Sequence, residues 1–292
     1  TGFGEVPPAE TLCDVIAWLN REARQPVVVE DNLGARFPAL ASHAHGCSGL
    51  LALRISERPP LYALFFRRER STPLREIHEI EFTSRCNLAC RWCDTAYTWR
   101  FHGDNRPHID GVDFARADNQ LMLDEADVAA RIAALGQRRL VVTGGEPLLQ
   151  GAALARLLAL LPGMTVEVET NGTVAPHPAL DPLVAQYNVS PKLAHSGNDA
   201  ALALVPERLA AWAADPRAWF KVVVASADDL AEVEALAKAH SLPAERIRLM
   251  PEGRDGATLR ARMAWLAPLA LEHGWGLSDR LHIHLSGDTR GT

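Results

Sequence analysis

Residues 86–93 read CNLACRWC, and three of the chain's five cysteines fall within these eight residues. The stretch directly follows the strand-like run IHEIEF (77–82). In a sheet of parallel strands, functional groups gather just beyond the C-terminal ends of the strands. The three thiols are therefore expected in a loop at the mouth of such a sheet.

Strand-like runs continue beyond this loop and alternate with helical patterns. In the helical pattern of 124–135, Asp124 suits the start and Gly136 suits the end. Repeated strand–helix units predict an α/β fold with a parallel sheet. Seven runs fit strands, and they leave open a full barrel, a partial barrel or a doubly wound open sheet. The runs are 77–82, 139–143, 165–169, 187–190, 219–224, 246–250 and 281–285.

Three thiols at C-x3-C-x2-C spacing suit two kinds of metal site. A zinc site needs four ligands, or three ligands and a water, and Cys47, Asp94 or His102 could supply the fourth. An iron–sulfur cluster is usually held by four thiolates, so three would leave one iron open to a substrate or cofactor. The spacing of the thiols alone is compatible with both sites.

Length and charge limit the class of protein. The 292 residues are enough for one large α/β domain, or for a medium domain with an appendage. The net charge of −6 disfavours non-specific binding to nucleic acid or an acidic membrane, and a small molecule is the expected partner. No apolar run approaches the roughly 18 residues of a membrane helix. The first residues, TGFGEVPPAE, lack the features of a signal peptide, so a cytoplasmic protein is predicted.

The cysteine motif resembles that of the radical S-adenosylmethionine (SAM) superfamily, which has an aromatic residue, here Trp92, before the last cysteine. TGGEP (143–147), after the next strand, resembles the segment with which this superfamily holds the amino group of SAM. Glycines allow close approach of the backbone, and a carboxylate accepts hydrogen bonds from an ammonium group. The resemblance implies a [4Fe–4S] cluster on Cys86, Cys90 and Cys93 rather than zinc.

Further segments resemble one family within this superfamily, that of 7-carboxy-7-deazaguanine synthase. The similarity covers residues 77–292 and implies a modified, often incomplete (β/α) barrel that commonly forms a homodimer. In sequence order the segments are CDTAYTW (93–99), VVTGGEPLLQ (141–150), VEVETNGT (166–173), NVSPK (188–192), FKVVV (220–224), LMPEG (249–253) and LHIHLSGDTRG (281–291).

This family resemblance implies a lyase reaction in the 7-deazapurine pathway that leads to queuosine. The substrate is 6-carboxy-5,6,7,8-tetrahydropterin. An electron donor such as flavodoxin or ferredoxin would reduce the cluster, and SAM cleavage would yield a 5′-deoxyadenosyl radical that takes hydrogen from the pterin C6. The six-membered ring would then contract with loss of ammonia to give 7-carboxy-7-deazaguanine.

The resemblance also assigns cofactor roles to individual residues. Ser190 and Lys192 have an alternative interpretation as a helix cap and a surface charge. The residues implied for SAM, with the backbone of the last two beside its adenine, are Gly144, Gly145, Glu146, Ser190, Lys192, Met250 and Pro251.

The implied substrate residues are Thr170, Asn171 and His282. Thr95 would approach a Mg²⁺ ion that binds the substrate carboxylate, since magnesium prefers oxygen ligands; the alternative is that Thr95 caps a turn. His282 and His284 alternate faces of the strand predicted at 281–285, so at most one points inward, and His282 is the predicted one.

Two family features are missing. Members normally have a glycine-rich QGEG-like motif and an arginine four residues before the first cluster cysteine, and both help to bind the pterin. Here Phe82 occupies the arginine position, and no such motif precedes Cys86 at a comparable distance. The residues that make the radical are complete, whereas half of the expected substrate pocket is absent. A radical SAM paralogue with another substrate is therefore the first alternative.

The first 70 residues differ from the rest and resemble a fragment of the PHY domain of bacterial phytochromes. They contain a helical pattern at 8–23 and strand-like runs at SGLLALRIS (48–56) and PLYALFFRRE (60–69). Two domains are predicted, with an α+β appendage at 1–70 and a radical SAM barrel at 71–292. An inactive barrel in a signalling or interaction protein is the alternative from another functional class.

Overall fold

The computed structural model describes residues 85–120 and 122–288, and four earlier strands through their backbone. The chain divides into two units, Thr1–Arg75 and Glu76–Thr292. In the first unit β1 (Val27–Val28), β2 (Leu51–Arg54) and β3 (Tyr62–Phe65) form a sheet of antiparallel pairs. β2 and β3 confirm the two predicted strands. The helix predicted at 8–23 lies outside the described residues.

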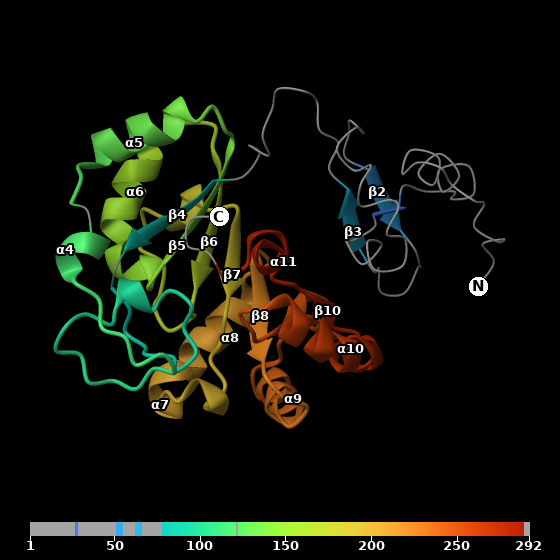
Figure 1. The fold of residues 1–292 in the computed structure, drawn as a ribbon. Coiled ribbons are helices and arrows are strands. Elements are labelled where there is room, and N and C mark those ends of the chain that lie inside the picture. The colour runs from blue at the N-terminus through green and yellow to red at the C-terminus, as the bar shows by residue number, and fades with distance from the viewer. Residues whose placement is uncertain are drawn as a thin grey trace, which may run out of the picture. The chain divides into compact units, whose positions relative to one another are not determined.

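The second unit is built on a sheet of seven strands, and every neighbouring pair is parallel (Figure 1). Six strands begin and end within one residue of the predicted runs, because each has apolar residues, alternating or consecutive, between turn residues. The strands are β4 (His78–Thr83), β5 (Arg139–Gly144), β6 (Thr165–Thr170), β7 (Gln186–Val189), β8 (Ala218–Val224), β9 (Ile247–Pro251) and β10 (Gly276–Leu277).

The strand order identifies the architecture as a partial barrel. The strands lie side by side in sequence order from β4 to β10. A doubly wound sheet reverses its strand order at a switch point, and this sheet has no reversal. β4 and β10 each pair with one neighbour, so the sheet does not close on itself. The connections between successive parallel strands are right-handed crossovers. The helices in these connections therefore lie on the same face of the sheet.

The second unit contains eight described α-helices, shown in green to red in Figure 1. Asp255 caps α10 by accepting hydrogen bonds from the backbone N–H groups of Ala257 at 3.0 Å and Thr258 at 2.8 Å. The helices are α4 (Arg116–Asn119), α5 (Glu125–Ala134), α6 (Gly151–Ala159), α7 (Ala200–Ala203), α8 (Pro206–Ala214), α9 (Asp229–His240), α10 (Gly256–Glu272) and α11 (Leu281–Ser286).

α5 confirms the helix predicted at 124–135, with differences at both ends. Gly136 follows it with φ of +71°, the left-handed conformation expected after a helix. Asp124 lies at the N-cap, but its side chain makes no capping hydrogen bond. Ala129 and Ile132 are the buried residues of this helix.

The core lies between the sheet and the helices. Val142, Val168 and Tyr187 are neighbours on adjacent strands and are fully buried. Each such side chain stabilises the fold by about 1.5 to 3 kcal/mol relative to exposure. The opposite face of the sheet carries charge, where Lys221 on β8 donates to Glu169 on β6 at 2.6 Å. One face of the sheet therefore makes the core, and the other is free for polar chemistry.

The strand predicted at 281–285 is wrong, because these residues form the helix α11. The edge of the sheet beside β9 is occupied by β10 instead. Within α11 Ile283 is buried, whereas Leu285 is 60% exposed. In the sequence LHIHL, Ile283 is thus the buried residue of a short helix. His282 and His284 lie on this helix and not on opposite faces of a strand.

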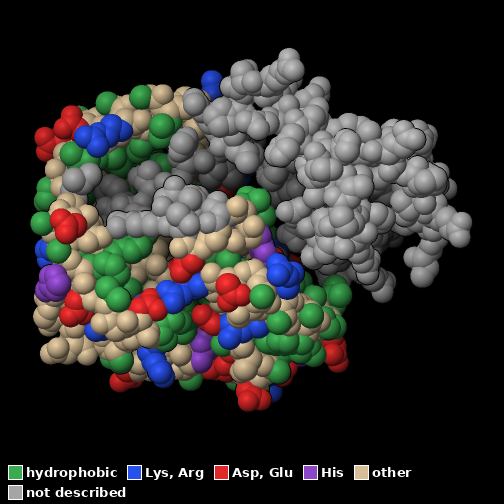
Figure 2. Space-filling model, in the orientation of Figure 1, with side chains coloured by type: hydrophobic (Ala, Val, Ile, Leu, Met, Phe, Trp, Pro, Cys, Tyr) green, Lys and Arg blue, Asp and Glu red, His purple; other side chains and the backbone are tan. Residues whose placement is uncertain are grey.

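One face of the second unit is mixed in charge. Figure 2 shows Lys and Arg side chains interspersed with Asp and Glu on the described part of the visible face. No described helix is both long enough and apolar enough to cross a membrane.

Candidate active site

The three cysteines of residues 86–93 lie in the loop that follows β4, and we call these residues the cysteine loop. All three are free thiols, with Cys90 buried and the other two half-buried. Burial, with smaller contributions from charge repulsion by Cys93 and Cys90, raises the pKa of Cys86 to about 12. Burial also raises the pKa of Cys93, with a further contribution from Asp94. Thiolates at Cys86 and Cys93 are thus unfavourable at neutral pH unless a metal binds them.

The TGGEP turn after β5 packs directly on the start of the cysteine loop. The backbone N–H of Glu146 donates to the carbonyl of Arg85 at 2.7 Å. A Cβ atom at Gly145 would overlap this same carbonyl oxygen, so a residue with a side chain would have to shift the backbone. Gly145 is therefore required for the contact between the two segments.

The Glu146 side chain is completely buried and joins this turn to the end of β6. Its carboxylate accepts hydrogen bonds from Leu148 N at 3.0 Å, Thr170 Oγ1 at 2.9 Å and Asn171 N at 2.7 Å. Burial raises the pKa of Glu146, and these hydrogen bonds oppose the rise. Thr170 itself is buried, like Val166 and Val168 on the same strand, and its hydroxyl donates its hydrogen bond to Glu146.

Asparagine side chains continue the connection to the cysteine loop. Asn171 donates through Nδ2 to Asn87 Oδ1 at 2.9 Å, and Asn87 donates through its own Nδ2 to Thr173 Oγ1 at 2.8 Å. Asn171 is 6% exposed. The segment after β6 thus contacts the cysteine loop one residue after Cys86.

The segment after β7 lies along the other half of the cysteine loop. Lys192 donates to Ser190 Oγ at 2.7 Å, and its ammonium lies 5.7 Å from the centre of the Trp92 ring. Trp92 stacks on His195 with ring centres 5.4 Å apart. The buried indole N–H of Trp92 has no hydrogen-bond partner within the described part of the chain. A polar cofactor next to the thiols would suit this donor.

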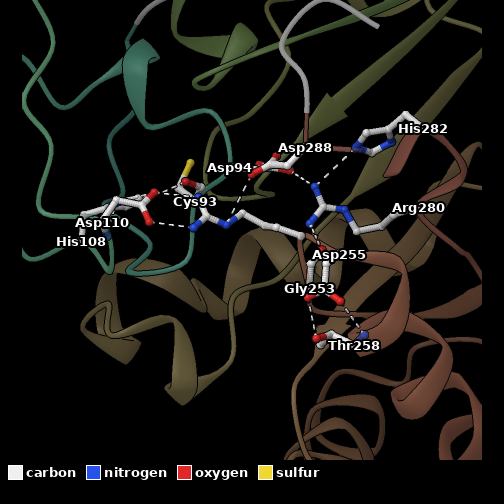
Figure 3. A network of polar contacts seen from close by, with 11 residues as sticks. Cys93, Asp94, His108, Asp110, Gly253, Asp255, Thr258, Arg280, His282 and Asp288 are labelled. Carbon is white, nitrogen blue, oxygen red and sulfur yellow. Dashed lines mark hydrogen bonds and ion pairs between the residues drawn. The ribbon is translucent and has the colours of Figure 1, made fainter. Parts of the chain in front are cut away.

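Arg280, which precedes α11, joins the residue after Cys93 to the segment after β9 (Figure 3). It is 7% exposed. Its guanidinium donates to the carbonyl of Gly253 at 2.6 Å and pairs with the Asp94 carboxylate. Met250 and Pro251, at the end of β9, lie a few residues before Gly253.

His282 points toward the same guanidinium, with its Nε2 3.5 Å from Arg280 Nη2 (Figure 3). The residue is exposed to solvent, although its ring is partly covered. Burial of the ring lowers the pKa of His282, and the charge of Arg280 lowers it further. The structure therefore brings His282 beside Asp94 and Arg280, on a helix rather than on the predicted strand.

A second arginine makes a parallel connection. Arg254 donates to both carboxylate oxygens of Asp110 at 2.6 Å. His108 Nε2 lies 2.7 Å from the carbonyl oxygen of Cys93, within hydrogen-bond distance. Arg254 and Arg280 thus join the chain that follows Cys93 to the segment after β9 and to the residue before α11.

Thr95 lies two residues after the last cysteine and beside its sulfur. Its Oγ1 is 3.5 Å from Cys93 Sγ, and it makes no capping hydrogen bond to the 3-10 helix Ala96–Thr98 that it precedes. Among the described residues, no three His, Cys, Asp or Glu side chains are already arranged as a metal site.

The donor set at the cysteine loop is compatible with an iron–sulfur cluster. Of the alternative zinc ligands, Asp94 pairs with Arg280, His102 is exposed and Cys47 lies outside the described residues. The remaining donors are three thiols on one loop, which suit a cluster with one iron left open.

Sequence reasoning missed three features of this site. Asn198 contacts a cluster thiol, Arg280 holds Asp94, and Glu169 pairs with Lys221 on the open face of the sheet. The last pair had a signal, because VEVE and FKVVV place charges within apolar strands. Asn198 and Arg280 had none, since their partners lie over 100 residues away in sequence.

Comparisons with known proteins agree with this geometry. A family model described as the radical SAM superfamily matches residues 80–187. A 7-carboxy-7-deazaguanine synthase from Pyrobaculum aerophilum is 38% identical over 210 residues, which are 70% of this chain and 84% of that protein. The chain belongs to the 7-carboxy-7-deazaguanine synthase family.

Two further comparisons are with another relative in sequence and with a solved structure. A 7-carboxy-7-deazaguanine synthase from Rhodopirellula baltica is 33% identical over 227 residues, covering 72% of this chain and 79% of that protein. The crystal structure of QueE from Escherichia coli aligns with a TM-score of 0.46 and 24% identity, covering 70% of this chain and 85% of that chain.

The comparisons also confirm that the N-terminal residues resemble a phytochrome. A family model described as the phytochrome region matches residues 1–75. The synthase family and its radical SAM superfamily imply a [4Fe–4S] cluster and SAM for the second unit, and the three thiols of the cysteine loop suit that cluster.

Proposed function

We propose that this chain is a radical SAM lyase that converts 6-carboxy-5,6,7,8-tetrahydropterin into 7-carboxy-7-deazaguanine with loss of ammonia. The observation that carries the proposal is the 38% identity to a 7-carboxy-7-deazaguanine synthase across 84% of that protein. The geometry of the second unit supports it, because the cysteine loop, the TGGEP turn and the segment after β7 meet beyond the same ends of the strands.

Cys86, Cys90 and Cys93 would hold the cluster, and Gly144, Gly145 and Glu146 would hold the methionine end of SAM. When bound and reduced, the cluster supplies the electron that cleaves SAM. Glu146 orients the TGGEP turn through buried hydrogen bonds from Leu148 N, Thr170 Oγ1 and Asn171 N, with the Thr170 hydroxyl within reach of both carboxylate oxygens. Ser190 and Lys192 would line the same site, with Met250 and Pro251 on its adenine side.

On the substrate side, Thr95 would approach a Mg²⁺ ion together with substrate oxygens. Asn171 and His282 would contact the pterin. Thr170 would act through Glu146, since its hydroxyl is already bonded there. Asp94, Arg280 and His282 support a polar wall on this side, where a charged substrate could be oriented and water excluded.

We further propose that residues 71–292 form the catalytic domain and residues 1–70 an appendage. A flavodoxin or ferredoxin would supply the electron, and two copies of the chain would associate as in a homodimer. Size-exclusion chromatography with light scattering tests the association, and reduction of the loaded protein by each donor tests the electron source.

The activity is tested by anaerobic incubation of reconstituted protein with SAM, dithionite, Mg²⁺ and the tetrahydropterin. Mass spectrometry is expected to detect both 5′-deoxyadenosine and 7-carboxy-7-deazaguanine. A Cys90→Ala variant is the control, and it is expected to form neither product. Absence of both products from fully loaded wild-type protein would overturn the proposal.

A paralogue with another substrate is the second candidate, and a specific observation favours it. Phe82 stands where the family has the pterin-binding arginine, and no QGEG-like motif precedes the cysteine loop. Formation of 5′-deoxyadenosine without 7-carboxy-7-deazaguanine would favour this candidate. The Phe82→Arg variant sharpens the distinction, because restored product would identify the missing arginine as the cause.

A further inference from the structure

One side chain outside the cysteine loop donates a hydrogen bond to a cluster thiol. Asn198 Nδ2 lies 3.2 Å from Cys90 Sγ, which is within hydrogen-bond distance for sulfur. Cys90 is buried, with 7% of its surface exposed. Asn198 lies between Gly197 and the start of α7, in the segment that follows β7.

The orientation of this carboxamide follows from its other contact. Asn198 Oδ1 accepts a hydrogen bond from the backbone N–H of Ala89 at 2.8 Å. A backbone N–H can only donate, so the atom facing it must be the amide oxygen. The amide nitrogen therefore faces the sulfur, and it donates in that contact.

Neighbouring contacts hold Asn198 in place. The carbonyl of the fully buried Ser196 accepts from the backbone N–H of Arg91 at 2.8 Å, and Ser196 Oγ lies 3.0 Å from Asn198 Nδ2. Gly197 has φ of +77°, and a Cβ atom there would come within 2.5 Å of the Arg91 side chain. A side chain at this position would displace the Arg91 side chain, and the positive φ itself favours glycine. Two backbone contacts, at Ala89 and Arg91, lock the segment on either side of Cys90.

A hydrogen bond to a ligating sulfur favours the more negatively charged state of the metal centre. Reduction adds one electron to an iron–sulfur cluster, and hydrogen bonds to its sulfurs are among the factors that set its reduction potential. We propose that Asn198 is a positioning residue that raises the reduction potential of the cluster by donating its amide N–H to Cys90 Sγ. This inference rests on the proposed function, because it requires the cluster.

The test is a redox titration of the reconstituted full chain, followed by electron paramagnetic resonance in the absence of SAM and substrate. Asn198→Asp keeps an oxygen for Ala89 N but replaces the donor to sulfur by a carboxylate oxygen. Asn198→Leu has a similar shape and removes both contacts. Both variants are expected to have a more negative midpoint potential than the wild type, with Asn198→Asp the lower because of its added negative charge.

The control is Asn105→Asp, which makes the same charge change at an exposed residue and is expected to leave the midpoint unchanged. Iron and sulfide analysis shows whether each variant is loaded. Wild-type midpoints in loaded Asn198 variants would overturn the inference. Loss of the cluster from both variants would also overturn it, by restricting Asn198 to loop folding. If the wild type itself holds no cluster, the proposed function fails first, and the two failures are thereby distinguished.

Discussion

The two sides of the cysteine loop are held by different kinds of contact. On one side, residues 85–92 are bound to the segments after β5, β6 and β7 by hydrogen bonds that involve buried groups. On the other, the chain after Cys93 is held by Arg–carboxylate pairs whose acidic partners, Asp94 and Asp110, are 40% and 36% exposed. A buried donor left unpaired costs about 1 to 3 kcal/mol, whereas an exposed ion pair is worth about 0 to 1 kcal/mol.

This difference separates the two tasks of the proposed enzyme. The side with buried hydrogen bonds carries the residues implied for the cluster and the methionine end of SAM, and also Asn171, which is one of the proposed pterin contacts. The ion-paired side carries Thr95, Asp94 and His282, where the substrate would bind. A rigid side suits a cofactor site whose geometry must not vary, and on the other side the solvent-accessible Arg254–Asp110 pair can open with little loss of stability.

The largest loss of stability is expected for Gly145→Ala, on the side of the cysteine loop that is held by buried hydrogen bonds. The added methyl would overlap the Arg85 carbonyl, and only a backbone shift can relieve this overlap. Overpacking of this kind costs typically about 1 to 3 kcal/mol. Urea denaturation should report that loss, and iron content after reconstitution should fall with it.

Gly256→Ala is the matched control for this prediction. A Cβ atom at Gly256, the first residue of α10, meets only the ends of the Arg260 and His284 side chains. Because those ends can move and alanine favours a helix, this variant should be as stable as the wild type or more so. Equal stability and iron content in Gly145→Ala would mean that the close approach is not needed.

Glu146→Gln tests the buried carboxylate on the same side. A glutamine has one acceptor oxygen, so its NH₂ group would face Leu148 N or Asn171 N and leave that donor unpaired. We expect a loss of about 1 to 3 kcal/mol in the free energy of unfolding. Calorimetry should also show weaker SAM binding to the reconstituted protein. Glu272→Gln, at an exposed position, is the control and should stay within about 0.5 kcal/mol of the wild type.

Local patterns in the sequence explain which parts of the fold and of the site could be predicted. The strands of the sheet were predictable, because runs such as RLVVT and WFKVVV are apolar and bounded by turn residues. The cysteines and TGGEP were predictable because each is contiguous and follows a strand. α11 was not, because LHIHL alternates like a strand while its environment is set by β10, which has only two residues.

The contacts that join the segments could not be read from the sequence. Asn198 lies 108 residues from Cys90, and Arg280 lies 186 residues from Asp94. Neither residue belongs to a local pattern, so nothing nearby marks its partner. The hydrogen bond from Thr170 to Glu146 could not be predicted for the same reason, because the two residues meet only when β5 and β6 lie side by side.

A smaller effect is expected for Arg254→Ala on the ion-paired side. The pair with Asp110 is exposed, so its loss should cost no more than about 1 kcal/mol at low salt. The cost should nearly vanish in about 1 M NaCl, where the Debye length is about 3 Å. Urea denaturation at the two salt concentrations measures this difference. A cost that is independent of salt would contradict the contrast between the two sides.

The same pair has a defined pH dependence. Hydrogen bonding from Arg254 lowers the pKa of Asp110 below its ordinary value. The stability from this pair is therefore present above the unfolded pKa of about 3.9 and is lost as the pH falls through the folded value. Arg254→Ala should remove that part of the acid sensitivity.

The smallest effect is expected for His282→Gln. Burial first and Arg280 second lower the pKa of His282 in the folded protein. As the pH falls below about 6.5, the unfolded chain takes up a proton at this residue before the folded chain does, so stability decreases in that window. Without the ring, the melting temperature should fall less between about pH 7 and pH 5.5. His102→Gln, which removes an exposed histidine, is the comparison for the loss of one ionisable ring. If both variants weaken the pH dependence of the melting temperature equally, that dependence comes from overall charge. This result would remove the evidence that Arg280 lowers the pKa of His282 on the ion-paired side of the site.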